Sequence, residues 1–202
     1  MAFSVVLDTC VLFPNYLRDT LLRLAVAETY RPLWSLDILT ELERNLSDHT
    51  SPDQAARVVA KMREHFGDAE VIGYEPLIDA MPNDPKDRHV LAAAVRANAA
   101  AVITFNLSDF PSADLAPFAV QAIHPDQFLL NQLGLAPGAV VAVLERQTAR
   151  YQRPPRDLAA LLAVLERSGV PEFAEEARRH LRPEPPFDPR PGERKGRHRG
   201  GR

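Results

Sequence analysis

The chain has 202 residues, 46% of them hydrophobic and 25% charged, which is typical of a soluble protein with one domain and a small appendage. No apolar run approaches the roughly 18 residues of a membrane span, and no basic segment precedes the first apolar stretch as in a signal peptide, so we expect a cytoplasmic protein. The net charge of -3 combines an acidic body, residues 1–182, of charge -6 with a basic C-terminal segment, residues 183–202, of charge +3.

The first apolar stretch, residues 3–7, predicts a strand buried on both faces of a parallel sheet, because four of its five residues are apolar. The strand ends at Asp8. Ligands of open α/β folds bind beyond the carboxyl ends of the strands, so Asp8 either faces a site or caps the following turn. Cys10 is the only cysteine, which excludes an intrachain disulfide and argues against a thiolate metal site. We expect it to be a small buried hydrophobic side chain.

Helical and strand patterns follow one another as far as residue 73. Helices are predicted at residues 15–30, 38–46 and 52–67, and strands at residues 31–34 and 70–73. Ser35 and Ser51 are the predicted N-caps of the second and third helices. Glu41 lies off the centre of the apolar face of its helix, where its simplest role is an i,i+3 ion pair with Arg44.

Two acids open the next predicted helix, residues 89–98. Asp84, before Pro85, is the predicted N-cap, and Asp87 in the first turn is favoured by the helix dipole whatever the function. Residues 99–105 predict the fourth strand, which terminates in polar residues: Thr104, Asn106, Ser108 and Asp109. The fifth strand is predicted at residues 118–123. Alternating strands and helices indicate a mostly parallel five-stranded sheet with helices on both faces.

The remainder, residues 126–182, is predicted to be a helical extension. Its helices are predicted to start at Pro125, Pro137, near Asp157 and at Pro171. Leucines between residues 158 and 165 form an apolar stripe that packs on the sheet domain or in a helical hairpin, or else docks a partner. Residues 183–202 have no apolar residue beyond Phe187, so we expect a disordered basic tail that is solvated or binds phosphates weakly.

Acids from distant parts of the chain are predicted to lie near the carboxyl ends of the strands: Asp8, Glu41, Asp84, Asp87 and Asp109. Ionised carboxylates that converge repel one another, so either their pKa values rise or a multivalent cation neutralises them. Oxygen-only ligands favour Mg²⁺ or Mn²⁺ over zinc. Such an ion can activate water and shield the charge that develops on a phosphodiester, as in metal-dependent nucleases, with Glu41 orienting the water.

Four segments resemble the PIN-domain ribonuclease family in order and spacing. They are Val5-Val6-Leu7-Asp8-Thr9, Ser35-x5-Glu41, Asp84-x-x-Asp87-x-x-x-Leu91 and Val102-Ile103-Thr104-Phe105-Asn106-x-x-Asp109-Phe110. The resemblance covers residues 3 to about 125. It implies a PIN-like nuclease domain over residues 1–125 and hydrolysis of RNA with Mg²⁺ or Mn²⁺. Many bacterial members are VapC-type toxins, so it also implies a cognate antitoxin and a homodimer.

The resemblance also implies roles for individual residues. The metal-binding and catalytic acids would be Asp8, Glu41, Asp87 and Asp109. Thr104 would support the site, and Asp84 would be a supporting acid or only a cap. Many family members have Asp where this chain has Asn106, which bears on whether one or two ions bind. Candidate phosphate contacts are Arg88 and Arg96, for which a solvated helix face is the alternative, and the basic tail.

Other functions fit parts of this pattern. A phosphorelay receiver or signalling module also has acids at strand ends, but it requires a lysine at the site, and none of Lys61, Lys86 and Lys195 is predicted at a strand terminus. A phosphatase with Asp8 as nucleophile would need a second Asp where Cys10 stands. A catalytically inactive PIN scaffold would keep the fold without the chemistry.

Overall fold

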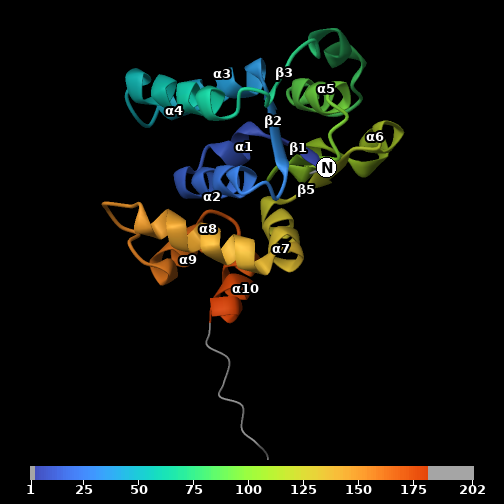
Figure 1. Cartoon of the computed structure of the whole chain (residues 1–202). Coiled ribbons are helices and arrows are strands. Elements are labelled where there is room, and N and C mark those ends of the chain that lie inside the picture. Colours follow the sequence, from blue (N-terminus) through green and yellow to red (C-terminus); the bar gives the residue numbers. More distant parts are fainter. Residues whose placement is uncertain (1–2, 182–202) are drawn as a thin grey trace, which may run out of the picture.

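The computed structural model describes residues 3–181 (Figure 1), so the predicted disordered tail at residues 183–202 lies outside the described residues. Five strands form one parallel sheet in the order β3-β2-β1-β4-β5. The predicted α/β class and sheet are therefore confirmed. The strands are β1 (Ser4–Leu7), β2 (Arg31–Ser35), β3 (Glu70–Val71), β4 (Ala101–Ile103) and β5 (Gln121–Ile123).

The strand order reverses between β1 and β4. After β1 the chain adds β2 and β3 on one side, then returns to add β4 and β5 on the other. In parallel α/β sheets such a reversal leaves a crevice at the carboxyl ends of the two central strands. Leu7 of β1 is paired with Ile103 of β4, so the residues that follow them, Asp8 and Thr104, meet at this point.

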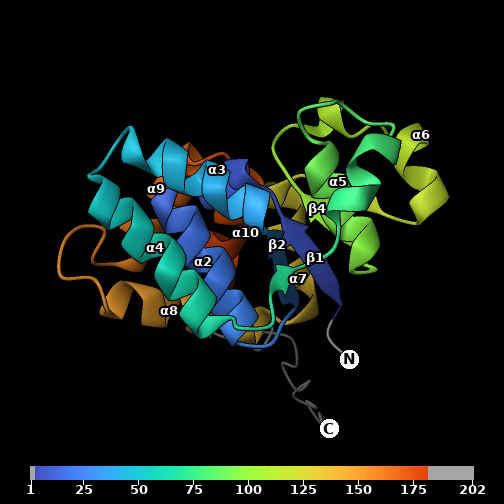
Figure 2. The same ribbon diagram turned by 90° about the horizontal axis from the view of Figure 1, so that it is seen from above.

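Helices cover both faces of the sheet. Figure 2 shows α2, α3 and α4 on one side of β1, and α5 and α6 on the other. Helix α5 packs directly on β2, β1 and β4. The helices of this part are α1 (Thr9–Leu12), α2 (Asn15–Val26), α3 (Leu36–Ser47), α4 (Pro52–His65), α5 (Arg88–Arg96) and α6 (Ser112–Leu115), with 3-10 turns η1 (Glu75–Ala80), η2 (Leu107–Asp109) and η3 (Ala116–Phe118).

Local side-chain chemistry explains most of the helix starts. Ser35 accepts a hydrogen bond from the backbone N–H of Ile38, and Ser51 accepts one from that of Gln54, as predicted for N-caps. The predicted N-cap at Asp84 is wrong. Residues 84–87 form a turn, so Asp87 occupies the N-cap position of α5, which begins at Arg88, one residue before the predicted start.

The first long helix and four of the five strands were predicted longer than they are; the exception is β2, which extends one residue beyond its predicted end to Ser35. Helix α2 ends at Val26 rather than near residue 30, because the chain turns at Glu28 with a positive φ of 58°. Strand β4 stops at Ile103, since the polar residues that follow it leave the sheet. The segment before β5 forms η3 and a left-handed residue, Ala119, instead of extended chain.

The C-terminal helices pack as a group, below the sheet in Figure 1. They are α7 (Pro125–Leu135), α8 (Pro137–Ala149), α9 (Leu158–Arg167) and α10 (Pro171–Leu181). Three of the leucines predicted as a stripe, Leu161, Leu162 and Leu165, are buried, and α9 packs against α10, α8 and α2. The stripe is therefore covered within this chain. No single helix among residues 3–181 is long and apolar enough to cross a membrane; α7 and α8 meet those criteria only as a pair bent by 116°.

A carboxylate and a side-chain hydrogen bond hold these helices in place. Asp126 of α7 accepts hydrogen bonds from the backbone N–H groups of Glu172, at 3.0 Å, and Phe173, at 2.7 Å, at the start of α10. This satisfies amide groups that a helix start otherwise leaves unpaired. Thr20 of α2 donates to Gln147 of α8 at 2.9 Å, and both side chains are fully buried. The C-terminal helices are thereby tied to the first long helix of the sheet domain.

Candidate active site

Asp8 lies at the end of β1 with only 4% of its surface exposed. Its Oδ2 accepts hydrogen bonds from the Thr104 hydroxyl at 2.7 Å and the Cys10 thiol at 3.1 Å. A buried carboxylate is costly unless such donors replace its hydration. Thr104, itself fully buried, accepts in turn from the backbone N–H of Asn106 at 3.0 Å. The carboxylate is thus fixed in orientation at the reversal of strand order.

Cys10 is part of this arrangement, so its prediction as a purely hydrophobic residue is wrong. It is half-buried, and its sulfur contacts the Thr104 hydroxyl at 3.3 Å and accepts from the backbone N–H of Phe105 at 3.2 Å. Burial, followed by the charge of Asp8, raises the pKa of the thiol to about 12. Cys10 therefore stays a neutral thiol at neutral pH and serves as a hydrogen-bond donor to Asp8.

Glu41 reaches this edge from α3. The Thr9 hydroxyl donates to its Oε2 at 2.9 Å and also contacts the carbonyl of Ile38 at 3.3 Å. The predicted ion pair with Arg44 is present at 3.8 Å, between side chains 38% and 72% exposed, where a pair contributes little. Thr9 rather than Arg44 therefore orients Glu41. Sequence reasoning missed Thr9, although its position directly after the acid that ends the strand was the available signal.

Asp87 shows that the acids share one region. Its pKa is raised from 3.8 to about 6, chiefly by burial and then by the negative charges of Asp8, Asp109, Asp84 and Glu41, in that order. These five acids come from four segments of the chain, since Asp84 and Asp87 share one turn. The structure therefore brings them close enough for each of the other four to disfavour ionisation of Asp87.

Asp109 and Asp84 form the outer part of this group. Asp109, half-buried in η2, accepts from the hydroxyl of its neighbour Ser108 at 3.2 Å. The backbone N–H of Asp84 donates to the carbonyl of Asp109 at 3.3 Å, while its exposed carboxylate accepts from the backbone N–H of Lys86 at 2.9 Å. Asn106 is exposed, and only its backbone takes part in the hydrogen bonding described above.

The two arginines predicted as phosphate contacts are placed differently. Arg88 is half-buried beside Asp87, and its Nε donates to the carbonyl of Asn83 at 3.4 Å. Arg96 is exposed at the far end of α5, about 12 Å from Arg88 at the usual helical rise of ~1.5 Å per residue. The structure therefore brings Arg88, but not Arg96, to the acidic edge.

The donor chemistry of this edge suits a hard divalent cation. All the acids offer oxygen, and a cation among them would relieve the repulsion that raises the pKa of Asp87. Within residues 3–181, however, no three His, Cys, Asp or Glu side chains are already placed to ligate one ion together. Ion binding would therefore have to draw the carboxylates inward, except for Asp8, which is held in place.

The chain is therefore an α/β protein with a group of acids at the carboxyl edge of its parallel sheet. Residues 4–108 match the family model described as "PIN domain", and residues 125–179 match that described as "VapC50 C-terminal domain". The first match spans more than half of the chain, so the chain belongs to the PIN-domain family, as its sequence motifs predicted.

One curated relative extends this finding. The chain is 46% identical over 119 residues to "Putative ribonuclease VapC50" of Mycobacterium tuberculosis (strain ATCC 25618 / H37Rv), a match that covers 59% of this chain and 70% of the relative. No solved structure matches the chain.

Proposed function

We propose that the protein is an endoribonuclease that hydrolyses RNA phosphodiester bonds with Mg²⁺ or Mn²⁺. The observation that carries this proposal is the buried Asp8, held by Thr104 and Cys10, beside further acids that raise the pKa of Asp87. Membership of the PIN-domain family and the similarity to "Putative ribonuclease VapC50" support the same activity.

In the proposed reaction Asp8, Glu41, Asp87 and Asp109 hold the ion. The ion would supply an activated water and shield the charge that develops on the phosphate. The chain itself positions the reacting groups. Thr104 and Cys10 fix Asp8, and Thr9 fixes one oxygen of Glu41, which leaves the other oxygen to orient or accept a proton from the attacking water.

The biological role we propose is that of the toxin in a type II toxin-antitoxin pair. The support is the match to the VapC50 C-terminal domain and the VapC50 relative. On this proposal the protein acts as a homodimer in the cytoplasm and is restrained by a cognate antitoxin. A short reading frame for a DNA-binding protein next to this gene, and co-purification of its product with this chain, are the expected observations.

The direct test compares RNA cleavage by the wild type and Asp8→Asn, each with Mn²⁺ and with a chelator. We expect cleavage only by the wild type with Mn²⁺. Asp79→Asn is the matched control, because Asp79 is an exposed acid in η1 and lies outside the group that acts on Asp87. Equal cleavage by wild type and Asp8→Asn would reject the catalytic assignment. Metal-dependent RNA binding without cleavage by the wild type would instead support the inactive-scaffold alternative.

A further inference from the structure

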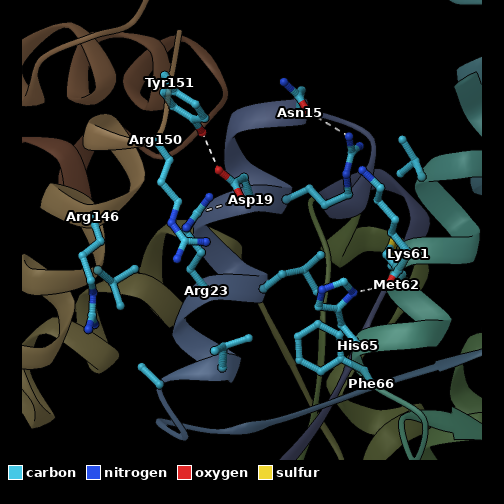
Figure 3. Close-up of a pocket in the computed structure, with 16 residues that line it drawn as sticks. Asn15, Asp19, Arg23, Lys61, Met62, His65, Phe66, Arg146, Arg150 and Tyr151 are labelled. Atoms are coloured by element: carbon cyan, nitrogen blue, oxygen red, sulfur yellow. Dashed lines mark hydrogen bonds and ion pairs between the residues drawn. The ribbon is translucent and has the colours of Figure 1, made fainter.

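A pronounced hollow lies away from the acidic edge. It is a groove of about 800 Å³ between α2, α4 and α8, and none of the acids that act on Asp87 lines it. Figure 3 shows side chains from all three helices turned into it. Its basic side chains are Arg18, Arg23, Lys61, His65, Arg146 and Arg150, and its only acid is Asp19. We call it the basic groove.

The one acid of the basic groove is already engaged. Asp19 pairs with Arg23 at 2.9 Å and accepts a hydrogen bond from the Tyr151 hydroxyl at 2.5 Å. Arg18 is also committed, since its guanidinium donates to the carbonyl of Leu12 and to Asn15. These contacts build a rigid floor along α2, and they leave no free carboxylate in the groove to neutralise the remaining cations.

Three cations at the rim remain available. Lys61, Arg146 and Arg150 are exposed, and none of them forms an ion pair with another residue between 3 and 181. In Figure 3 the side chain of Arg150, just after α8, and that of Arg23, in α2, extend toward one another. Like charges that face one space repel each other unless an anion lies between them. Because residues 1–182 carry a net charge of -6, this concentration of positive charge is local.

The aromatic side chains of the lining favour nucleic acid over an acidic polypeptide. Aromatic rings lie among the cations, namely Phe66 and His65 at the end of α4 and Tyr151 just after α8. Grooves that bind single-stranded nucleic acid combine positive charge along the backbone with aromatic rings on which bases stack. The planar guanidinium groups of Arg146 and Arg150 also match the geometry of phosphate oxygens.

The position of the basic groove relates it to the acidic edge. Asn15, which lines one end, begins α2 only seven residues after Asp8. Helix α2 then runs back toward the start of the parallel strand β2, so the groove extends away from the carboxyl edge of the sheet. An RNA strand cut at that edge could continue along α2.

We propose that the basic groove binds the sugar-phosphate backbone of single-stranded RNA beyond the cleavage point. This inference rests on the proposed ribonuclease function. It gives the C-terminal helices a role, because α8 and the residue that follows it form the wall that carries Arg146 and Arg150. The PIN domain alone would lack that wall.

The test measures binding of a single-stranded RNA oligonucleotide by full-length protein with Asp8→Asn, which prevents cleavage, over a series of salt concentrations. In this background, the double variant Arg146→Ala and Arg150→Ala (the groove pair) is compared with the double variant Arg57→Ala and Arg167→Ala (the control pair). Arg57 and Arg167 are exposed residues of α4 and α9 that lie outside the groove. We expect the groove pair to weaken binding and to flatten the slope of log K against log[salt] by about 1.4, at ~0.7 per lost phosphate contact. The control pair should change neither.

Three results would overturn the inference. The first two are equal salt slopes or equal RNA affinities for the groove double variant and the control double variant. The third is a groove double variant that no longer binds polyglutamate but still binds RNA as before. The last would identify the basic groove as a site for acidic polypeptide. The proposed function is judged separately, by Mn²⁺-dependent cleavage. Cleavage by the wild type with unchanged RNA binding by the groove pair would refute only the groove, whereas groove-dependent binding without cleavage would refute only the nuclease.

Discussion

The hydroxyl of Thr104 donates to the carboxylate of Asp8 at 2.7 Å, joining two residues 96 positions apart in the sequence. Because the same hydroxyl accepts from the backbone N–H of Asn106, its own hydrogen is directed at Asp8. The bond links the ends of β4 and β1, where the strand order reverses. Asp8 is therefore positioned by the sheet itself.

Removal of this hydroxyl tests its positioning role. Thr104→Val keeps the shape of the side chain but leaves a buried carboxylate with one donor fewer, so we expect the free energy of unfolding to fall by about 1–3 kcal/mol. Partners that orient metal ligands typically contribute ~10–100-fold to metal affinity or activity, and we expect a loss of that size in Mn²⁺ affinity. Calorimetric titration with Mn²⁺ measures it. Thr104→Ser should restore the affinity, and its failure to do so would contradict a hydrogen-bonding role.

Asp87 predicts a pH dependence of stability. Its pKa of about 6 lies above the usual 3.8, so the folded protein holds this proton more tightly than the unfolded chain does. Asp87 therefore stabilises the fold at low pH, and this contribution is lost as the pH rises through about 6. In chelator, Asp87→Asn should melt at a higher temperature than the wild type above pH 6, with the difference shrinking toward about pH 4. A constant difference at every pH would contradict this assignment.

Metal binding should stabilise the folded protein. An ion that binds only the folded state raises the free energy of unfolding by ~2.7 kcal/mol when present at about 100 times its dissociation constant. We expect Mn²⁺ to raise the melting temperature of the wild type and of Asp79→Asn, but not that of Asp8→Asn. The measurement is thermal unfolding with and without Mn²⁺, and an equal rise in all three proteins would place the ion elsewhere.

Thr9 is expected to act through Glu41. Thr9→Val removes the donor to Glu41 at a net cost of ~0.5–1.5 kcal/mol in stability, and it frees Glu41 to rotate away from the site. RNA cleavage with saturating Mn²⁺ should fall in kcat, while Thr9→Ser should retain it. An unchanged kcat for Thr9→Val would show that the orientation of Glu41 does not matter for the reaction.

Gly169 connects the C-terminal helices to the acidic edge. It has a φ of +93°, and a Cβ there would lie 2.7 Å from the ring of Phe105, the residue after Thr104. We expect Gly169→Ala to lower the free energy of unfolding by about 1–3 kcal/mol, because the backbone is strained and Phe105 must move. Gly67→Ala, in open space, is the control. Denaturant unfolding of both variants checks the difference.

The sequence was sufficient to predict the features that depend on short-range patterns. Apolar runs located the strands, and Ser35 and Ser51 marked helix starts because their side chains bond to amides three residues on. Asp84 satisfied the same local rule and was still not the N-cap. The sequence predicts a turn at residues 82–87, but it does not show that Asp84 opens this turn while Asp87 closes it and directly precedes α5.

The position of Thr9 directly after Asp8 marks it as a candidate, but the partners of Thr9 and Cys10 could not be predicted, for a different reason. Each depends on a partner far along the chain, Glu41 for Thr9 and Thr104 for Cys10. Which way these side chains turn is decided by the packing of α1 against α3 and by the register of β1 with β4. A single sequence contains no periodic signal for such contacts.

The bonds from Asp126 to the start of α10 bear on what a protease would do to this molecule. Exposed arginines at positions 150 and 156 lie in the connection between α8 and α9, where trypsin has ready access; Arg153 is not a cleavage site, because Pro154 follows it. A nick there would not release the final two helices, because Asp126, together with the packing of α9 and α10 on α7, α8 and α2, would keep the fragments associated. The cut protein would run as two bands on a denaturing gel yet elute from a sizing column as one particle.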